Sequence, residues 1–287
     1  MAELRELQRK LDSVEALQEI VNAMRNLAAI YVRRAESALS AMRPYADIVA
    51  TGLRLVLQRL EAVGAEPNDS GPALAVVFAA DQGLCGTYNE RVTRAAVAFA
   101  RAAGRPVEFA AVGRRGTELL TLRGNRPLLS LPSPTSLEGI DARIPELAAD
   151  VFDAYSERGA TALFFIYNEY EGMGRFKEKV RPVLPPRLAQ LADTGQRAFA
   201  YEPLLSAAPE DLLGAFIEEY FFVEFYRALL ESHSSENGAR LLSMTAASTN
   251  IEERLEQVTK EFQTVRQDTI TAELLDVVGG AEALRER

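Results

Sequence analysis

The stretch from Ser232 to Leu284 contains no proline and repeats apolar residues at alternating steps of four and three. These residues fit the a and d positions of a heptad: Ile251, Leu255, Val258, Phe262, Val265, Thr269 and Ala272. Because glycine is absent between Gly238 and Gly279, a helix that starts near Glu210 can run for about 70 residues, on the order of 100 Å. Helices gain most of their stability from packing an apolar face, so this one needs a partner helix along its length.

The first 60 residues predict that partner. Neither glycine nor proline occurs before Pro44. A narrow apolar stripe recurs at steps of three and four: Leu4, Leu7, Leu11, Val14, Leu17, Val21, Met24, Leu27 and Tyr31. We therefore expect a long antiparallel coiled coil of the two terminal helices, about 80 Å or more in length. Two ordinary helices of a bundle are the alternative, which does not explain lengths far above the usual ~11–12 residues. Pro44 is expected to bend or locally break the first helix.

The middle of the chain has a different pattern. Residues 61–72 are rich in Gly, Pro, Asn and Asp and read as a linker. Four predicted strands then alternate with three predicted helices, and a partly alternating strand follows: strands Leu74–Ala79, Val107–Val112, Leu128–Leu131, Thr161–Tyr167 and Arg175–Leu184; helices Asn89–Ala103, Arg114–Leu122 and Ile140–Arg158. This order predicts a doubly wound, mostly parallel sheet with an antiparallel edge strand. We expect an N-terminal coiled-coil helix (1–60), an inserted Rossmann-like α/β domain (61–205) and a C-terminal coiled-coil helix (206–287).

Composition excludes several classes of protein. The net charge of -9 argues against nucleic acid as the main partner, because phosphate contacts need a dense basic face. A single cysteine excludes an internal disulfide framework. We find no signal peptide, and the richest apolar run, Ala73 to Ala80, is far too short to span a bilayer.

The α/β domain offers few groups for chemistry. Gly83-Leu84-Cys85-Gly86 lies between a strand and a helix, yet it matches neither common phosphate-loop pattern, so a tight turn is favoured over a nucleotide site. Cys85 could have a lowered pKa near a helix N-terminus, but the one histidine, His233, lies on the far helix and no Cys–His pair is expected. Asp81 and Glu169 follow strands, where acids bind ligands or, more often, cap turns. No cofactor or metal site is predicted.

Several segments resemble the gamma subunit of the rotary F-type ATP synthase, its central shaft, over nearly the full length. The family's K-A-M-x-M-V-A-A-like run, its R-P-Y, its S-D-x-G-L-C-G-x-x-N turn, its Y-N-x-F strand end and its Y-E-P are similar to residues 22–29, 43–45, 80–89, 164–170 and 201–203. Ala80 replaces the serine of the turn. The most specific matches are the E-x-x-S-E-x-x-A-R run, over Glu231–Ala247, and the R-Q-x-x-I-T-x-E-L run, over Arg266–Leu284.

The resemblance implies a non-catalytic subunit of a proton-translocating enzyme complex. In the family, the shaft turns inside a ring of alpha and beta subunits, and its foot sits with the epsilon subunit on the membrane ring of c subunits. ATP chemistry belongs to beta, so no nucleotide or other cofactor is expected here. The implied location is the cytoplasmic face of the bacterial inner membrane, with peripheral attachment through the c ring.

The resemblance also assigns residues. Arg266 and Gln267 match the family's contact with the beta catch loops, where a guanidinium fork can hold carboxylate or carbonyl oxygens. Met24 and Arg25 match the contact with a mobile acidic segment of beta. Without the motif, such polar residues are more often exposed helix positions.

Four further residues match the foot near the c ring and epsilon: Arg43, Tyr45, Tyr201 and Glu202. For Tyr45, packing beside Pro44 is an equal alternative. The end of the chain, Val277 to Leu284, is expected to turn in an apolar bearing.

The chain departs from the family in its first helix, where Glu15, Glu19, Asn22 and Tyr31 stand in place of frequent lysines. Two other classes remain open. An enzyme built on the α/β domain predicts saturable binding of a nucleotide or metabolite. A coiled-coil adaptor, or a vacuolar-type central stalk, predicts little strand content between residues 74 and 167.

Overall fold

The computed structural model describes residues 2–61, 71–172, 174–186, 191 and 207–285. Its contacts divide the chain into two compact units. One unit, here unit 1, comprises Met1–Leu27 and Leu241–Arg287; the other, unit 2, comprises Ala28–Arg240. Two helices contribute to both units: α1 (Ala2–Glu61) and α6 (Pro209–Arg285).

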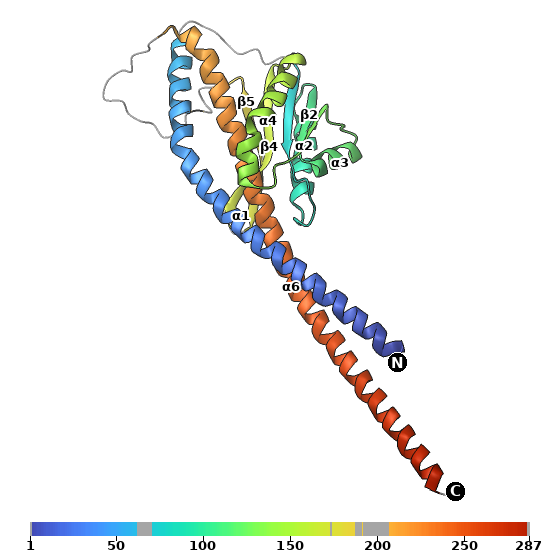
Figure 1. Cartoon of the computed structure of the whole chain (residues 1–287). Helices are drawn as coiled ribbons and strands as arrows, with labels where there is room; N and C mark the ends of the chain where they lie inside the picture. The colour runs from blue at the N-terminus through green and yellow to red at the C-terminus, as the bar shows by residue number, and fades with distance from the viewer. Residues whose placement is uncertain (1, 62–70, 173, 187–190, 192–206, 286–287) are drawn as a thin grey trace. The chain divides into compact units, whose positions relative to one another are not determined.

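α1 passes through Pro44 without interruption. Figure 1 shows the part of α1 that belongs to unit 2, on both sides of Pro44, as one curved ribbon rather than two helices. Pro44 is exposed, so the carbonyl that loses its N–H partner can be hydrated and the ring meets no packed neighbour. The expected local break is therefore absent, whereas the other expectation, a bend, agrees with the curve of the helix.

The seam of unit 1 follows the predicted heptad on α6. Ser248 and Val258 are buried, and the half-buried positions between and beyond them keep the step of three and four: Ile251, Leu255, Phe262, Val265 and Thr269. Ala272 is exposed, so the seam ends before it.

On α1 the predicted stripe is only partly correct. Its first members and Val21 are half-buried, as expected: Leu4, Leu7, Leu11 and Val14. Leu17 and Leu27, however, are each 51% exposed. Gln18 is half-buried in place of Leu17, and Arg25 is half-buried beside Met24, which like Tyr31 is half-buried as predicted. From residue 17 on, the side of α1 that packs on α6 is thus more polar than the sequence stripe predicted.

Unit 2 is built on a five-stranded sheet in the order β3-β2-β1-β4-β5. The strands are β1 (Ala73–Phe78), β2 (Val107–Val112), β3 (Leu129–Leu131), β4 (Ala162–Gly172) and β5 (Arg175–Leu184). β1 pairs in parallel with β2 and β4, β2 pairs in parallel with β3, and only β5 is antiparallel. The predicted doubly wound, mostly parallel sheet is confirmed.

Three shorter helices cover this sheet: α2 (Tyr88–Ala102), α3 (Arg114–Leu122) and α4 (Leu137–Glu157). Figure 1 shows α2 and α3 on one side of the sheet and α4 on the other. β1 is buried on both faces, and its side chains alternate between two cores. Leu74, Val76 and Phe78 meet α4 and the long helices, whereas Ala75 and Val77 meet α2 and α3. A run that is apolar throughout is the expected sequence of such a strand.

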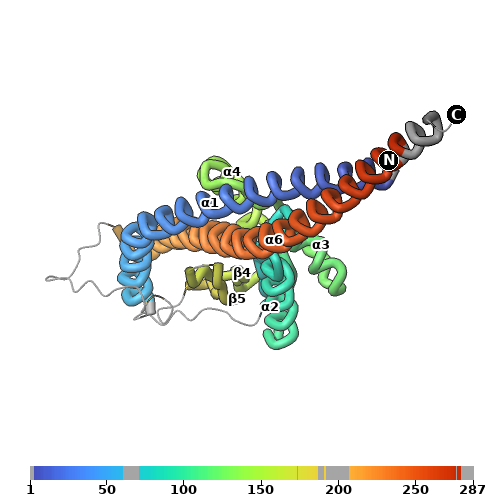
Figure 2. Tube along the Cα trace, turned by 90° about the horizontal axis from the view of Figure 1, so that it is seen from below, coloured from blue at the N-terminus to red at the C-terminus, as the bar shows by residue number. Residues whose placement is uncertain are grey.

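Within unit 2, α1 and α6 lie side by side and antiparallel, as Figures 1 and 2 both show. The Tyr45 hydroxyl donates to the Glu219 carboxylate at 2.5 Å. Nearby, Gly52 leaves no room for a Cβ, because one would lie 2.3 Å from Phe216. The two helices therefore approach closely, and their apolar residues join the core on the α4 side of the sheet.

Gly113, at the N-terminus of α3, lies where a side chain would clash with the backbone after β1. Its φ is +105°, and a Cβ there would lie 2.2 Å from the carbonyl oxygen of Ala79. We expect Gly113→Ala to lower the free energy of unfolding by at least ~3 kcal/mol, since strain and a backbone clash add. Gly124→Ala is the control: its φ is +77° with nothing within 4 Å, so it should cost only ~1–2 kcal/mol. Urea denaturation measures both, and equal losses would contradict the steric argument.

Candidate functional site

The sheet reverses its strand order between β1 and β4, and its carboxyl edge there is where open α/β sheets usually bind ligands. In this protein a segment of α6 fills that place. Ala239 packs in one apolar cluster with Ala80, Cys85, Tyr88 and Phe176, which come from the loop after β1, from α2 and from β5. The crevice that would admit a nucleotide is thus occupied by the chain's own helix.

Polar contacts hold the same segment in place. The Ser235 hydroxyl donates to the Asn168 carbonyl of β4 at 2.8 Å, and the Asn168 amide donates to the Tyr88 carbonyl at 3.1 Å. Arg240 donates to Glu236 at 2.6 Å, and the same guanidinium nitrogen lies 3.5 Å from the carbonyl oxygen of Gly83. We call the α6 segment 231–240 with these partners the joint. It ties α6 to the strand-to-helix turn where a phosphate loop would otherwise lie.

Cys85 is part of the wall of the joint rather than a reactive group. It is buried, and burial raises the pKa of its thiol to about 11, with the Glu236 carboxylate adding to the effect. The expectation of a lowered pKa was wrong, because loss of solvent around the thiolate outweighs the nearby helix end. Asn89 donates to the sulfur at 3.2 Å and accepts from the Ala80 N–H at 2.8 Å, which fixes the turn.

The two acids that follow strands stabilise turns and pairs. The Asp81 carboxylate accepts from the N–H groups of Arg114, at 2.9 Å, and Ser133, at 3.0 Å. It thereby joins the ends of three segments and caps the first turn of α3. Glu169 forms an ion pair with Lys179 across the β4–β5 pair. Neither acid is left to bind a ligand.

Further charged residues, which the sequence did not predict as a group, hold the β4–β5 hairpin against α6. Glu224 is 4% exposed and forms an ion pair with Arg181 of β5; Arg227 lies 3.8 Å from the same carboxylate. Glu231 accepts from the Tyr170 N–H at 2.9 Å, and burial raises the pKa of its carboxyl. One sequence pattern could have predicted these contacts: two acids of the helix, Glu224 and Glu231, lie one heptad apart on an otherwise apolar face.

His233 of α6 is buried and faces α1. Its ring lies 5.6 Å, centroid to centroid, from the ring of Tyr31, and Asn237 is within hydrogen-bond distance. Burial lowers the pKa of the imidazole from 6.5 to about 4, and the positive charge of Arg240 acts in the same direction. At neutral pH His233 is therefore uncharged and serves as a packing residue.

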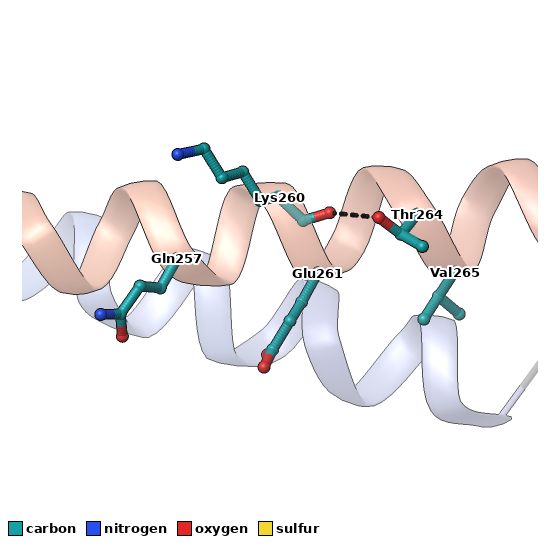
Figure 3. Close-up of a pocket in the computed structure, with 5 residues that line it drawn as sticks. All are labelled: Gln257, Lys260, Glu261, Thr264 and Val265. Carbon is teal, nitrogen blue, oxygen red and sulfur yellow. Dashed lines mark hydrogen bonds between the residues drawn. The ribbon is translucent and has the colours of Figure 1, made fainter.

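The residues that the resemblance assigns to a beta contact lie in unit 1. Arg266 and Gln267 are both exposed on α6. Just before them α6 lines a shallow groove with Gln257, Lys260, Glu261, Thr264 and Val265. Figure 3 shows Gln257, Glu261 and Val265 on one side of α6, with Lys260 pointing away from them. An exposed guanidinium beside this groove is free to meet another protein.

Met24 and Arg25 are half-buried on α1. Arg25 donates to the Ser248 hydroxyl of α6 at 3.4 Å. Arg266 lies 18 residues beyond Ser248 in the sequence, about 27 Å along the helix, so the structure does not bring the two predicted contact pairs together. They form two separate candidate surfaces on one unit.

The predicted foot is described in part. Arg43 and Tyr45 are exposed on α1, and the hydroxyl of Tyr45 is bonded to Glu219. Tyr201 and Glu202 lie outside the described residues. At the other end of α6, Leu274, Leu275, Val277 and Val278 are at least half exposed.

Among the described residues, no group of three or more His, Cys, Asp or Glu side chains is placed to hold a metal ion. No helix in the described part of the chain has the length and apolar character needed to cross a membrane.

Comparison with known proteins identifies the family. The family model described as ATP synthase matches residues 3–284. The ATP synthase gamma chain of Moorella thermoacetica is 33% identical over 296 residues, covering 99% of this chain and 100% of the relative. The gamma chain of Syntrophus aciditrophicus is 33% identical over 300 residues, covering 99% of each. The chain belongs to the ATP synthase gamma chain family. The resemblance in the sequence motifs is confirmed, and with it the role of a central rotor shaft.

Solved structures of this family share the fold. The rotor of the Euglena gracilis mitochondrial ATP synthase matches with a TM-score of 0.64 at 16% identity, covering 94% of this chain and 99% of that one. The central stalk of the Tetrahymena thermophila mitochondrial enzyme, solved with its c ring, matches with a TM-score of 0.61 at 24% identity, covering 80% of this chain and 99% of that one. The adaptor with little strand content is thereby set aside, since unit 2 contains the five-stranded sheet.

The buried ion pair of the joint gives a stability prediction. Arg240→Met leaves the Glu236 carboxylate largely buried without its cation, and we expect a loss of about 3–5 kcal/mol in the free energy of unfolding at pH 8. The double variant Arg240→Met, Glu236→Leu removes both charges and should recover most of that loss. Thermal and urea unfolding of the wild type and the two variants test this, and a double variant no better than the single one would contradict it.

His233 gives a pH prediction. Its pKa is lowered in the folded protein, so the unfolded chain binds the extra proton between about pH 6.5 and pH 4. This contribution to stability is complete above pH 6.5 and is lost as the pH falls through that range. Between pH 7 and pH 5 the wild type should lose about 2 kcal/mol more than His233→Gln. Because His233 is the single histidine, the difference between the two proteins isolates its effect; identical losses would show that the imidazole titrates normally.

Proposed function

We propose that this chain is the central shaft of an F-type ATP synthase and transmits torque between a membrane c ring and a catalytic alpha/beta hexamer. The proposed role couples the flow of protons or sodium ions to the synthesis or hydrolysis of ATP. The observation that supports it best is the joint, where the chain's own α6 occupies the crevice in which an α/β enzyme would bind its ligand. A chain without a free crevice is suited to carrying force rather than to catalysis.

The partners follow from the family. We propose alpha and beta subunits around unit 1, and an epsilon subunit and the c ring at the foot. The chain would then lie on the cytoplasmic side of a bacterial inner membrane, attached peripherally through the c ring. The bacterial gamma chains to which it is similar support this location.

The contact with beta is proposed at Arg266 and Gln267. Both are exposed on α6, and the Thr271 hydroxyl donates to the backbone carbonyl of Gln267 rather than to its side chain. A free guanidinium fork can bind a carboxylate or two carbonyls of a catch loop and release them as the shaft turns. Met24 and Arg25 are proposed as a second contact, for an acidic segment of beta.

The foot is proposed at Arg43 and Tyr45 of α1, together with Tyr201 and Glu202. Arg43 is exposed and adjoins the exposed Pro44, whereas the Tyr45 ring is held by Glu219. A ring fixed in this way loses little side-chain entropy on binding a partner. The division into helix 1–60, domain 61–205 and helix 206–287 remains our proposal for the functional parts.

Co-expression of the chain with the alpha and beta subunits of its own genome tests the proposal. We expect a stable complex with ATPase activity, and we expect Arg266→Ala plus Gln267→Ala to reduce turnover about five- to tenfold, the cost of one charge-assisted contact in the rate-limiting rotation.

The matched control is Glu253→Ala plus Arg254→Ala, two exposed neighbours on the same helix, which should leave turnover unchanged. A complex that forms and ignores the first double change would keep the shaft role and reject these two residues as the contact. A chain that remains alone in solution would reject the shaft role itself.

A further inference from the structure

In unit 1, two neighbouring sides of α1 could pack on α6. In the structure the more polar of the two sides does so. Val14 and Val21 are half-buried and belong to either stripe. With them, the seam could take Leu17, as the sequence predicted; Met24, a later member of that stripe, is half-buried in the structure. Instead Leu17 is 51% exposed, and Gln18 is half-buried. Hydrophobic burial alone favours the other choice, because leucine gains more than glutamine on leaving water.

The two choices differ by a small rotation of α1 about its axis. Neighbouring positions of a heptad are about 100° apart. Keeping Val14 and Val21 in the seam while exchanging Gln18 for Leu17 moves the centre of the seam by half of this, about 50°. Such a rotation can be spread over a few turns of the supercoil, so helix continuity alone does not decide between the two.

A polar layer on α6 distinguishes them. Ser248 is 2% exposed within the seam. Its hydroxyl accepts from Arg25 at 3.4 Å and lies 3.2 Å from the Asn22 amide oxygen. Its one proton can go to that oxygen or to the Glu252 carboxylate at 3.0 Å. All four residues belong to unit 1.

Losing the hydrogen bonds of Ser248 would disfavour the arrangement with Leu17 turned inward. A buried hydroxyl without a partner is unfavourable, and the penalty exceeds the net worth of the bond itself. With Leu17 turned inward, Asn22 and Arg25 would turn away from α6 and Ser248 would face apolar side chains. A single polar group in an apolar seam is known to select one helix arrangement over others.

We propose that Ser248 is a positioning residue that sets the rotational phase of α1 on α6. Through Arg25 and Asn22 it keeps the more polar side of α1 in the seam. It thereby holds Leu17, Ile20 and Leu27 outward as an apolar face, with exposures of 51%, 57% and 51%. The phase depends only on contacts inside unit 1; what meets the outward face in a complex rests on the proposed function.

Thiol labelling of the isolated full-length chain tests the phase. In a Cys85→Ala background, single reporters are placed at Leu17→Cys and Gln18→Cys, and the rates of reaction with a maleimide are compared. We expect the thiol at position 17 to react at least about tenfold faster than the thiol at position 18. Adding Ser248→Leu should reduce this ratio about fivefold or more, as α1 turns its leucines inward.

Two matched variants separate phase from general loosening. Ser248→Thr keeps the hydroxyl and should keep the wild-type ratio. Thr249→Leu changes the exposed neighbour, whose hydroxyl bonds only to α6 itself, and should also keep it. A ratio that stays unchanged in a helical Ser248→Leu protein would overturn the proposal.

If Ser248→Leu instead lowers helicity and exposes both thiols, Ser248→Ala decides, since it removes the hydroxyl without adding bulk. A fall of the ratio in Ser248→Ala supports the proposal, and an unchanged ratio rejects it. These results do not depend on alpha or beta subunits. Failure of the complex to assemble would therefore count against the proposed function and leave the phase result standing.

Discussion

The packing of α6 across the carboxyl edge of the sheet is the interaction on which unit 2 depends. The sheet is buried on both faces, and α6 supplies part of the core on one face and fills the crevice between β1 and β4 at its edge. Buried ion pairs at Glu224 and Glu236 lie along this contact. Such pairs add little net stability over an apolar contact, but a wrong placement leaves charges unpaired, so they specify one position of the helix.

This arrangement also closes the place where doubly wound domains usually bind their ligands. In such folds, function depends on loops at the carboxyl edge of the strands. Here the turn after β1 is bonded to Asn89 and lies against α6, and Asp81 is used to join α3 to the loop after β3. Polar groups that could bind a ligand in an open crevice, such as Asp81, instead form hydrogen bonds that stabilise the sheet and its contacts. That suits a subunit whose domain must move with its shaft.

Unit 1 depends on a different balance. Two helices can bury only a narrow seam, and most of their residues remain exposed. The exposed apolar residues at its C-terminal end and on α1 are too many for a free helix pair in water, which indicates that partners cover them. Polar groups inside the seam, such as Ser248, cost stability and give the pair one arrangement.

The sequence by itself determined the order of the elements, the long helices and the family. The runs that are apolar throughout, the change of period and the motif around Arg266 depend on local pattern, and each survives in the structure. The tertiary structure alone decided which side of α1 faces α6, the pKa of Cys85, and the pairing of Arg181 with Glu224. Each depends on what surrounds a side chain in space. A one-dimensional pattern does not record burial, or the partners that residues far apart in the chain give one another.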